Sequence, residues 1–340
     1  MSDVPFAKME PITVDPDFYA MHSSYHTEPQ DFASETTSLA STIAKGRLEN
    51  GRRYQAIKDD DYWGPSDEQQ FEAFEIGHMV FLVLDHNEPN PLFRAPIGDS
   101  PKNILDIGTG QGSWAIDVAD LYPTATVDDI LREWTWREPF DFIHLRLMYG
   151  AFDPAGWEKV YQQAYDALEP GGWIEQMELD VRVYSDDKSL KPSHELYGWG
   201  DMFIGCSERA GDRSLRTHET MRGAIEKAGF IDVHEVKYKI PLGPWAKDKL
   251  LKEAGHLQFA HWNAALEGWA MWLLTHHGMP EPWTKEEVQV FLAKIRTELK
   301  NPHIHAYEPA NRVWARKPTL EEQKAREEKN KVKVKVEPST

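Results

Sequence analysis

The chain has 340 residues, of which 41% are hydrophobic and 11% aromatic, enough to bury the core of one large domain with additions or of two small domains. Its formal net charge of −18 disfavours nucleic acid and anionic membranes as direct partners, because a negative field repels phosphate groups. A single cysteine, Cys206, excludes an intramolecular disulfide and a cysteine-based zinc cluster. With neither a signal peptide nor an apolar run of roughly 18 residues, the sequence predicts a protein of the cytoplasm or the nucleus.

The N-terminal part is predicted to be a flexible arm followed by a helical cover. Residues 1–30 show no apolar periodicity, and we expect a mobile arm there. Residues 31–100 are assigned to the cover, with one helix over about 35–49 and a second that begins near Ser66. His78 lies in the second helix, where a partly buried core histidine is a simpler interpretation than a catalytic one.

The stretch NILDIGTGQGSW at 103–114 predicts a buried strand, a tight glycine turn and the first turn of a helix. Its glycines let the backbone approach a ligand closely, because glycine has no Cβ and tolerates positive φ, and the helix start offers unpaired N–H groups. The spacing from Asp106 is D-x-G-x-G-x-G, whereas dinucleotide folds use G-x-G-x-x-G, so an NAD-dependent oxidoreductase is disfavoured. We interpret the turn as a nucleotide-type binding site, with a purely structural turn as the alternative.

The next buried strand, Phe140–Leu145, follows too soon for an ordinary doubly wound nucleotide-binding half. Only residues 108–139 separate it from the first strand, and one β-α-β crossover already needs about 30 residues in all. Two further strands and a helix do not fit, and only 125–127 offers the start of one more strand.

Helices and strands alternate regularly after this gap. Helices are predicted over about 157–168, 196–210, 217–228, 245–276 and 284–299, and strands over about 173–183, 231–240 and 312–315. The tail over 319–340 is charged, lacks apolar periodicity and is expected to be disordered.

Taken together, these motifs resemble the fungal LaeA-like methyltransferases, which use S-adenosylmethionine (SAM). The resemblance covers roughly residues 30–318 and rests on LDIGTGQGSWAID at 105–117, FDFIHLR at 140–146, AYDALEPGGWIEQMELD at 164–180, LGPWAKD at 242–248 and IHAY at 304–307. It implies an α/β fold: a Rossmann-like class I methyltransferase sheet over residues 101–318, with helical N-terminal and C-terminal additions and SAM over the carboxyl ends of the strands.

The resemblance also implies which residues hold the cofactor. The turn on the methionine and ribose side of SAM would consist of Asp106, Gly108, Thr109, Gly110 and Gly112. The segment DDILREWTW at 128–136 resembles a segment of relatives, DDAEDPWTW, that follows their third strand. The resemblance would place Asp128 or Asp129 near the adenine.

One departure from the family pattern bears on the cofactor. Relatives carry, between the strand start at 125–127 and this Asp pair, a segment with a ribose-binding acid and a third strand, and this sequence lacks it. A carboxylate that accepts hydrogen bonds from two ribose hydroxyls gains roughly 1.5–3 kcal/mol from each bond. Loss of this carboxylate therefore predicts that the cofactor binds about tenfold to a thousandfold more weakly. It also predicts a sheet shortened after Val127. The chain is then a degenerate member or the product of a mis-spliced or mispredicted gene, unless Asp128 or Asp129 moves in to hold the ribose.

His144 and Arg146, at the mouth of the fourth strand, are the candidate catalytic residues that the resemblance places opposite the turn. Methyl transfer from a sulfonium is an in-line displacement, so the protein mainly aligns the partners and excludes water. For a hydroxyl acceptor a base helps, and an imidazole such as that of His144 ordinarily titrates near neutral pH; a structural histidine is the equal alternative. Arg146 would orient an acidic acceptor or pair with a nearby carboxylate.

The sequence therefore predicts a SAM-dependent methyltransferase of fungal secondary metabolism, which either modifies a small-molecule acceptor or acts as a LaeA-like regulator of metabolite gene clusters. The alternative from a different class is a degenerate, non-catalytic scaffold or binding partner that kept the fold. A protein partner fits either hypothesis. No metal is expected, because His303 and His305 have no third ligand nearby in the sequence.

Overall fold

The centre of the molecule is a six-stranded mixed sheet with the strand order β4-β3-β5-β6-β8-β7. The computed structural model describes residues 9–18, 46–55, 63–123, 126–129, 138–211 and 213–336. The strands of the sheet are β3 (Asn103–Ile107), β4 (Thr126–Asp129), β5 (Phe140–Arg146), β6 (Leu168–Leu179), β7 (Ile231–Pro241) and β8 (Tyr307–Arg316). β4, β3, β5 and β6 are parallel, and β8 runs antiparallel to both β6 and β7. The predicted α/β, Rossmann-like sheet is thereby confirmed.

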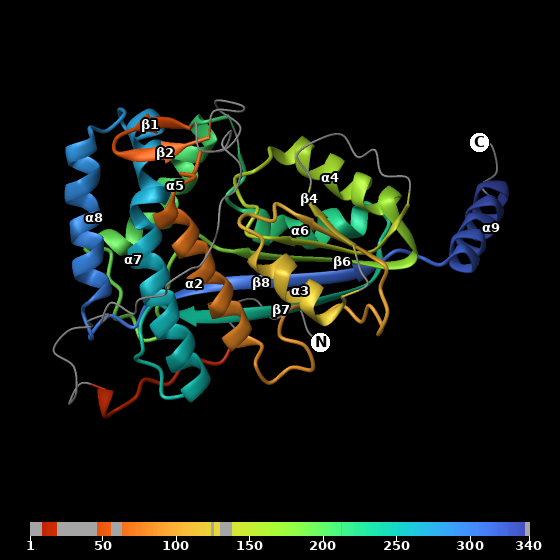
Figure 1. Cartoon of the computed structure of the whole chain (residues 1–340), viewed down its shortest axis with the longest axis horizontal. Coiled ribbons are helices and arrows are strands. Elements are labelled where there is room, and N and C mark those ends of the chain that lie inside the picture. The colour runs from red at the N-terminus through yellow and green to blue at the C-terminus, as the bar shows by residue number, and fades with distance from the viewer. Residues whose placement is uncertain are drawn as a thin grey trace.

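Helices cover both faces of this sheet (Figure 1). The helices of the described chain are α2 (Glu68–Leu84), α3 (Ser113–Leu121), α4 (Pro154–Ala167), α5 (Glu195–Arg209), α6 (Thr217–Lys227), α7 (Lys249–His277), α8 (Lys285–Leu299) and α9 (Leu320–Val336), of which α2, α3, α4 and α6 pack on the sheet as follows. On one face, Val80 of α2 packs with Met177 of β6, and Trp114 of α3 packs with Phe142 of β5. On the other face, Ile225 of α6 joins the side chains of α4. Alternate side chains of each central strand therefore enter separate cores.

α5, α7 and α8 form a helical lobe beside the sheet, together with the hairpin of β1 (Arg47–Glu49) and β2 (Arg52–Tyr54) (Figure 1). Aromatic rings fill the core of this lobe. Trp199 stacks on Phe203 with ring centroids 4.1 Å apart, and Trp262 of α7 is fully buried beside them. The apolar segment predicted over 245–276 is thus one long helix whose tryptophans serve mainly as core.

β4 is the edge strand of the described sheet, and it continues beyond the three residues predicted for it. Its register pairs Ile104 with Val127 and Asp106 with Asp129. Only residues 130–139 connect β4 to β5, which lies on the far side of β3. A crossover between parallel strands already takes about a dozen residues, so a further strand and helix do not fit in this segment. The predicted shortening of the sheet is confirmed, although the strand ends at Asp129 rather than at Val127.

The predicted mobility of the N-terminal arm is wrong for residues 9–18. The backbone N–H of Asp15 donates to the carbonyl of Trp245 at 2.9 Å. Phe18 is only 1% exposed and packs in the core of the helical lobe. One buried ring, a few backbone bonds and an ion pair between Asp15 and Lys252 hold this segment, and none of these leaves a periodic pattern in the sequence. The rest of the predicted arm lies outside the described residues.

The helical cover begins with a hairpin rather than with the first predicted helix. Residues 47–49 form β1, because Asn50 and Gly51 adopt positive φ angles of 52° and 91° and turn the chain back onto β2. The preceding part of that predicted helix lies almost entirely outside the described residues. α2 begins close to the predicted start, with Asp67 rather than Ser66 as its N-cap.

The tail is helical over Leu320–Val336, which contradicts the predicted disorder there. The side chain of Glu322 accepts from the N–H of Thr319, and the N–H of Glu322 donates to the Thr319 hydroxyl, so a reciprocal cap opens α9. Arg316 adds two hydrogen bonds to the same carboxylate. α9 stands apart from the body of the molecule (Figure 1), so capping and charge, rather than a buried face, account for this helix.

Four charged side chains form a buried network at the C-terminal end of α2. Arg312 of β8 is 2% exposed and binds Asp85 at 2.8 Å and Glu175 of β6 at 2.9 Å. Arg94 binds Asp85 at 2.6 Å, and its backbone N–H donates to Glu175 at 2.8 Å. The network therefore ties the end of α2 and the segment before β3 to the middle of the sheet.

The buried carboxyl group of Glu308, on β8, makes the stability of the fold depend on pH. Burial raises its pKa from the ordinary value of 4.5 to about 8, although Gln258 and Trp262 of α7 donate hydrogen bonds to it. Between these two values the folded chain binds more protons than the unfolded chain. The protonated Glu308 carboxyl group therefore contributes fully to the stability of the fold below about pH 4.5, and this contribution is lost as the pH rises through 8.

Glu308→Gln is expected to be more stable than the wild type at about pH 9, by about 2–4 kcal/mol, and similar to it at low pH. The amide keeps the acceptor oxygen but never becomes charged. Urea unfolding at about pH 5 and pH 9 measures the difference. Glu286→Gln, at an exposed position of α8, is the control, and an identical pH dependence in both variants would contradict the assignment.

Candidate functional site

The glycine turn after β3 is exposed at the carboxyl ends of the parallel strands. Gly108, Gly110 and Gly112 have φ angles of 74°, 61° and 91°, in the left-handed region that favours glycine. A Cβ on Gly108 would lie 2.2 Å from Sδ of Met148, whereas a Cβ on Gly110 would meet nothing within 4 Å. Met148 therefore packs against the inner side of the turn at Gly108, whereas no side chain of a described residue covers Gly110 on the outer side. The turn lies directly before the first N–H groups of α3. This arrangement suits a nucleotide-type ligand.

Asp106, at the end of β3, is held beside this turn by two hydrogen bonds. The hydroxyl of Thr109 donates to its Oδ2 at 2.7 Å, and Nδ1 of His144 lies 2.8 Å from its Oδ1. Because a carboxylate only accepts, Nδ1 of His144 carries the proton and Nε2 keeps its lone pair. The imidazole also stacks on Trp114 of α3, with ring centroids 3.7 Å apart. Burial lowers the pKa of His144 and so favours the neutral ring.

Arg146 ends β5 two residues after His144, on the same face of the sheet. It is half-buried, and its guanidinium lies 5.4 Å from the ring centroid of Phe81 on α2. Burial lowers the pKa of Arg146 to about 10, which is the reverse of the effect of an ion pair. Within the described part of the chain, no carboxylate lies within ion-pair distance of this side chain. The structural ion pair considered for Arg146 is therefore not found there.

His78 of α2 joins this site, although no motif in the sequence marks it. Its Nε2 lies 2.8 Å from the carboxylate of Asp117 on α3, and its side chain is 6% exposed. Burial, reinforced by the positive charge of Arg146, lowers the pKa of His78 to about 4. Its Nδ1 is buried and has no hydrogen-bond partner among the residues that the structure describes. The expected burial is confirmed, but its neighbours place His78 at the site rather than in an ordinary core.

Asp128 and Asp129 end β4, the strand next to β3. Asp129 pairs in register with Asp106, so the acid pair lies at the carboxyl end of the sheet beside the glycine turn. This position directly follows the second strand of the fold and does not lie beyond a third strand. The position agrees with the alternative stated above, in which Asp128 or Asp129 holds the ribose in place of the missing acid.

The segment after β5 connects the glycine turn with the helical lobe. Glu178, buried at the end of β6, accepts hydrogen bonds from the N–H groups of Met148 and Tyr149 at 3.1 and 3.0 Å. Burial raises the pKa of this carboxyl group to about 7. Because Met148 contacts Gly108, this buried carboxyl group indirectly supports the turn.

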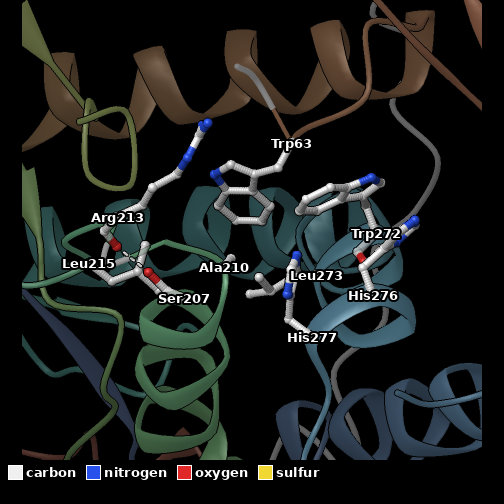
Figure 2. A pocket seen from close by; sticks show the side chains of 9 residues that line it. All are labelled: Trp63, Ser207, Ala210, Arg213, Leu215, Trp272, Leu273, His276 and His277. Atoms are coloured by element: carbon white, nitrogen blue, oxygen red, sulfur yellow. Dashed lines mark hydrogen bonds between the residues drawn. The ribbon is translucent and has the colours of Figure 1, made fainter. Parts of the chain in front are cut away.

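A pocket of about 340 Å³ lies beyond this segment (Figure 2). A Cβ on Gly150 would lie 3.1 Å from Leu215 and 3.2 Å from Trp63, two of the lining residues, so the segment runs along the back of the pocket wall. The other lining residues come from α5, the segment that follows it and the end of α7: Ser207, Ala210, Arg213, Trp272, Leu273, His276 and His277. No sequence pattern revealed this pocket, because its residues come from three distant segments.

Comparison with known proteins places this site within a family. Residues 85–235 match the family model described as a methyltransferase domain. Over 310 residues the chain is 32% identical to methyltransferase pytC of Aspergillus terreus, which covers 85% of this chain and 93% of that protein. Over 301 residues it is 32% identical to the secondary metabolism regulator LAE1 of Cochliobolus heterostrophus, which covers 80% of this chain and 94% of that protein. The chain belongs to the LaeA-like fungal methyltransferases.

A further relative of this LaeA-like methyltransferase is the protein-methionine methyltransferase laeA of Emericella nidulans. The two are 29% identical over 300 residues, which cover 79% of this chain and 76% of that protein.

Within the described ranges, no helix of the LaeA-like chain is both long and apolar enough to cross a bilayer.

Proposed function

We propose that this chain is a SAM-dependent methyltransferase that transfers a methyl group to a small-molecule acceptor in fungal secondary metabolism. The bare glycine turn at the carboxyl ends of the parallel strands carries this proposal, because open α/β sheets bind nucleotide-type ligands there. The relatives named methyltransferase pytC and secondary metabolism regulator LAE1 support the setting. The second name also supports regulation of metabolite gene clusters as a further role.

The residues around the turn fit SAM. Gly110 leaves room for a close approach of the ligand to the backbone, and Asp106 and Thr109 hold the turn in shape. Asp128 or Asp129, at the end of β4, would accept hydrogen bonds from the two ribose hydroxyls in place of the missing acid. Each charge-assisted bond of this kind is worth about 1.5–3 kcal/mol.

The residues at the end of β5 would then act on the acceptor. When bound, SAM supplies an activated methyl carbon, which bonds to the acceptor while the sulfur keeps the electron pair of the broken bond. Nε2 of His144 would take the proton of a hydroxyl acceptor, and the carboxylate of Asp106 would stabilise the resulting imidazolium. Arg146 would pair with a carboxylate of the acceptor. α2 covers these side chains and so helps to exclude water.

Calorimetric titration with S-adenosylhomocysteine tests the cofactor site. We expect micromolar binding by the wild type, and binding about tenfold to a thousandfold weaker in Asp128→Asn or Asp129→Asn, because the ribose loses a charged acceptor. Asp120→Asn, at an exposed position of α3, is the control and should bind like the wild type.

Each failure of this experiment has a separate meaning. If the wild type gives no heat at millimolar ligand, the chain is a non-catalytic scaffold and the proposed function is wrong. If the wild type binds and neither Asp variant differs from it, the assignment of the ribose acid is wrong.

A further inference from the structure

The segment that follows β5 has a backbone conformation that needs support from its surroundings. Leu147 has a φ angle of 55°, in the left-handed region that residues with a Cβ rarely adopt. Its N–H donates to the carbonyl of Met177 at 2.9 Å. The next side chain, that of Met148, lies so close to Gly108 of the glycine turn that a Cβ on this glycine would clash with the sulfur. The backbone of this segment therefore determines how Met148 packs against the turn.

Glu178, near the end of β6, holds this backbone with its carboxylate. The side chain is fully buried, and its oxygens accept hydrogen bonds from the N–H of Met148 at 3.1 Å and from the N–H of Tyr149 at 3.0 Å. The amide of Gln176 donates a third bond at 2.7 Å. Each carboxylate oxygen thus faces a backbone N–H group, which can only donate. A proton on either oxygen would place a donor against a donor, so this arrangement requires the ionised carboxylate.

The charged groups around Glu178 pair with one another rather than with this carboxylate. Tyr161 of α4 donates to the side-chain oxygen of Gln176 at 2.7 Å, and burial raises the pKa of this phenol, so it stays neutral. Leu145 of β5 and Asn311 of β8 lie on the same face of the sheet as Glu178 and carry no charge. The other titratable and charged groups on the packed elements are Asp180 of β6, His218 and Arg222 of α6, and Glu235 and Lys237 of β7. Within the described ranges, none of them forms an ion pair with Glu178, so no cation offsets the burial of its charge.

We infer that Glu178 is a positioning residue for cofactor binding: its ionised carboxylate keeps residues 147–149 in the conformation in which Met148 supports the glycine turn, and its protonation weakens the binding of SAM. This inference rests on the proposed function. Because burial raises the pKa of Glu178 to about 7, the change falls near neutral pH. Above this value the carboxyl group is ionised and the site binds at full strength, whereas below it the protonated group lowers the affinity.

Calorimetric titration of the full chain with S-adenosylhomocysteine at about pH 6 and pH 8 tests the inference. With a pKa of about 7, only about one-tenth of the chains carry the carboxylate at the lower pH, so we expect the Kd of the wild type to be about five- to tenfold higher there. Glu178→Gln places an amide N–H where the proton would be, and it should bind at both pH values about as weakly as the wild type at the lower pH.

Glu308→Gln is the matched control for this titration. Glu308 is also buried and has a raised pKa, but its carboxyl group bonds to Gln258 and Trp262 of α7 rather than to the segment after β5. This variant should keep the pH profile of the wild type within about twofold.

Amide hydrogen exchange of the ligand-free chain gives a readout that does not depend on the cofactor. At about pH 8 the N–H groups of Met148 and Tyr149 should exchange at least about tenfold faster in Glu178→Gln than in the wild type, and at about pH 6 the two proteins should exchange at similar rates. Comparing both proteins at one pH removes the intrinsic pH dependence of exchange. A merely structural role of Glu178 would raise the exchange rate by the same factor at both pH values.

The outcomes separate this inference from the proposed function. Equal affinity of the wild type at the two pH values, or a profile of Glu178→Gln that parallels the wild type, would overturn the role of Glu178 and leave the proposed function standing. If Glu178→Gln does not fold, Met148→Ala replaces it, and its affinity should no longer depend on pH because it lacks the side chain that reaches the turn. Absence of binding by the wild type at both pH values would overturn the proposed function, and the effect of Glu178 on the cofactor with it.

Discussion

Replacing Gly108 by alanine is expected to weaken the binding of S-adenosylhomocysteine by about a hundredfold or more and to lower the free energy of unfolding by about 1–3 kcal/mol. The new Cβ would lie 2.2 Å from Sδ of Met148, so either this side chain or the turn has to shift. The φ angle of 74° adds strain, because a residue with a Cβ in the left-handed region costs roughly 1–2 kcal/mol. Calorimetry and urea unfolding measure the two effects.

Gly98→Ala is the matched control for this variant. Gly98 has a φ angle of 78°, and a Cβ there would meet nothing within 4 Å, so the substitution adds the same backbone strain away from the turn. Adding Met148→Ala to Gly108→Ala removes the clash and should restore part of the affinity. If the Gly108 and Gly98 variants bind the ligand equally well, the turn is not the cofactor site.

Arg312→Met is expected to lower the free energy of unfolding by about 3–5 kcal/mol. Arg312 is almost completely buried and neutralises two buried carboxylates, those of Asp85 and Glu175. The variant leaves both acids in the interior without this cation, although Arg94 and the hydroxyl of Tyr238 still bind Asp85. Urea unfolding near pH 7 measures the loss.

Arg316→Met is the control, because it removes an arginine four residues away that also binds two carboxylates. Its partners Asp232 and Glu322 have side chains that are 50% and 41% exposed, so water can replace the lost cation. We expect a loss below about 1 kcal/mol. Equal losses in the two variants would mean that burial of the ion pairs does not determine their contribution.

The parts of the fold that the sequence predicts are those with strong local signals. β3 and β5 are buried parallel strands, which appear as nearly continuous apolar runs, and the reciprocal cap of Thr284 and Glu287 marks the start of α8. The hairpin of β1 and β2 does have a local signal, the Asn50-Gly51 turn, which the helix predicted over about 35–49 overlooked. The anchoring of Phe18, in contrast, depends on tertiary contacts that no short window of sequence contains. The helix α9 escaped prediction because capping and charge hold it without an apolar face.

The candidate site likewise contains residues that sequence motifs predict and residues that only the tertiary structure brings there. The glycine turn, His144 and Arg146 follow from motifs that directly follow or end strands, and the structure brings them to one edge of the sheet. His78 reaches this edge only because α2 crosses the sheet next to α3, and its carboxylate partner comes from a segment 39 residues away. The family frame places Asp128 and Asp129 after a third strand, whereas in the structure they end β4, the strand that pairs with β3, and their role toward the cofactor stays a prediction.

The buried charges at the end of α2 also constrain how this family can diverge. Arg312 binds Asp85 and Glu175 at once, so a change of Arg312 leaves two carboxylates in the interior without their shared cation. Arg94 adds a side-chain ion pair to Asp85 only, because its bond to Glu175 comes from the backbone N–H. The positions of Arg312, Asp85 and Glu175 are therefore expected to covary. Lineages that replace Arg312 should carry a neutral side chain at one of the two acids, whereas the exposed pairs around Arg316 are free to drift independently.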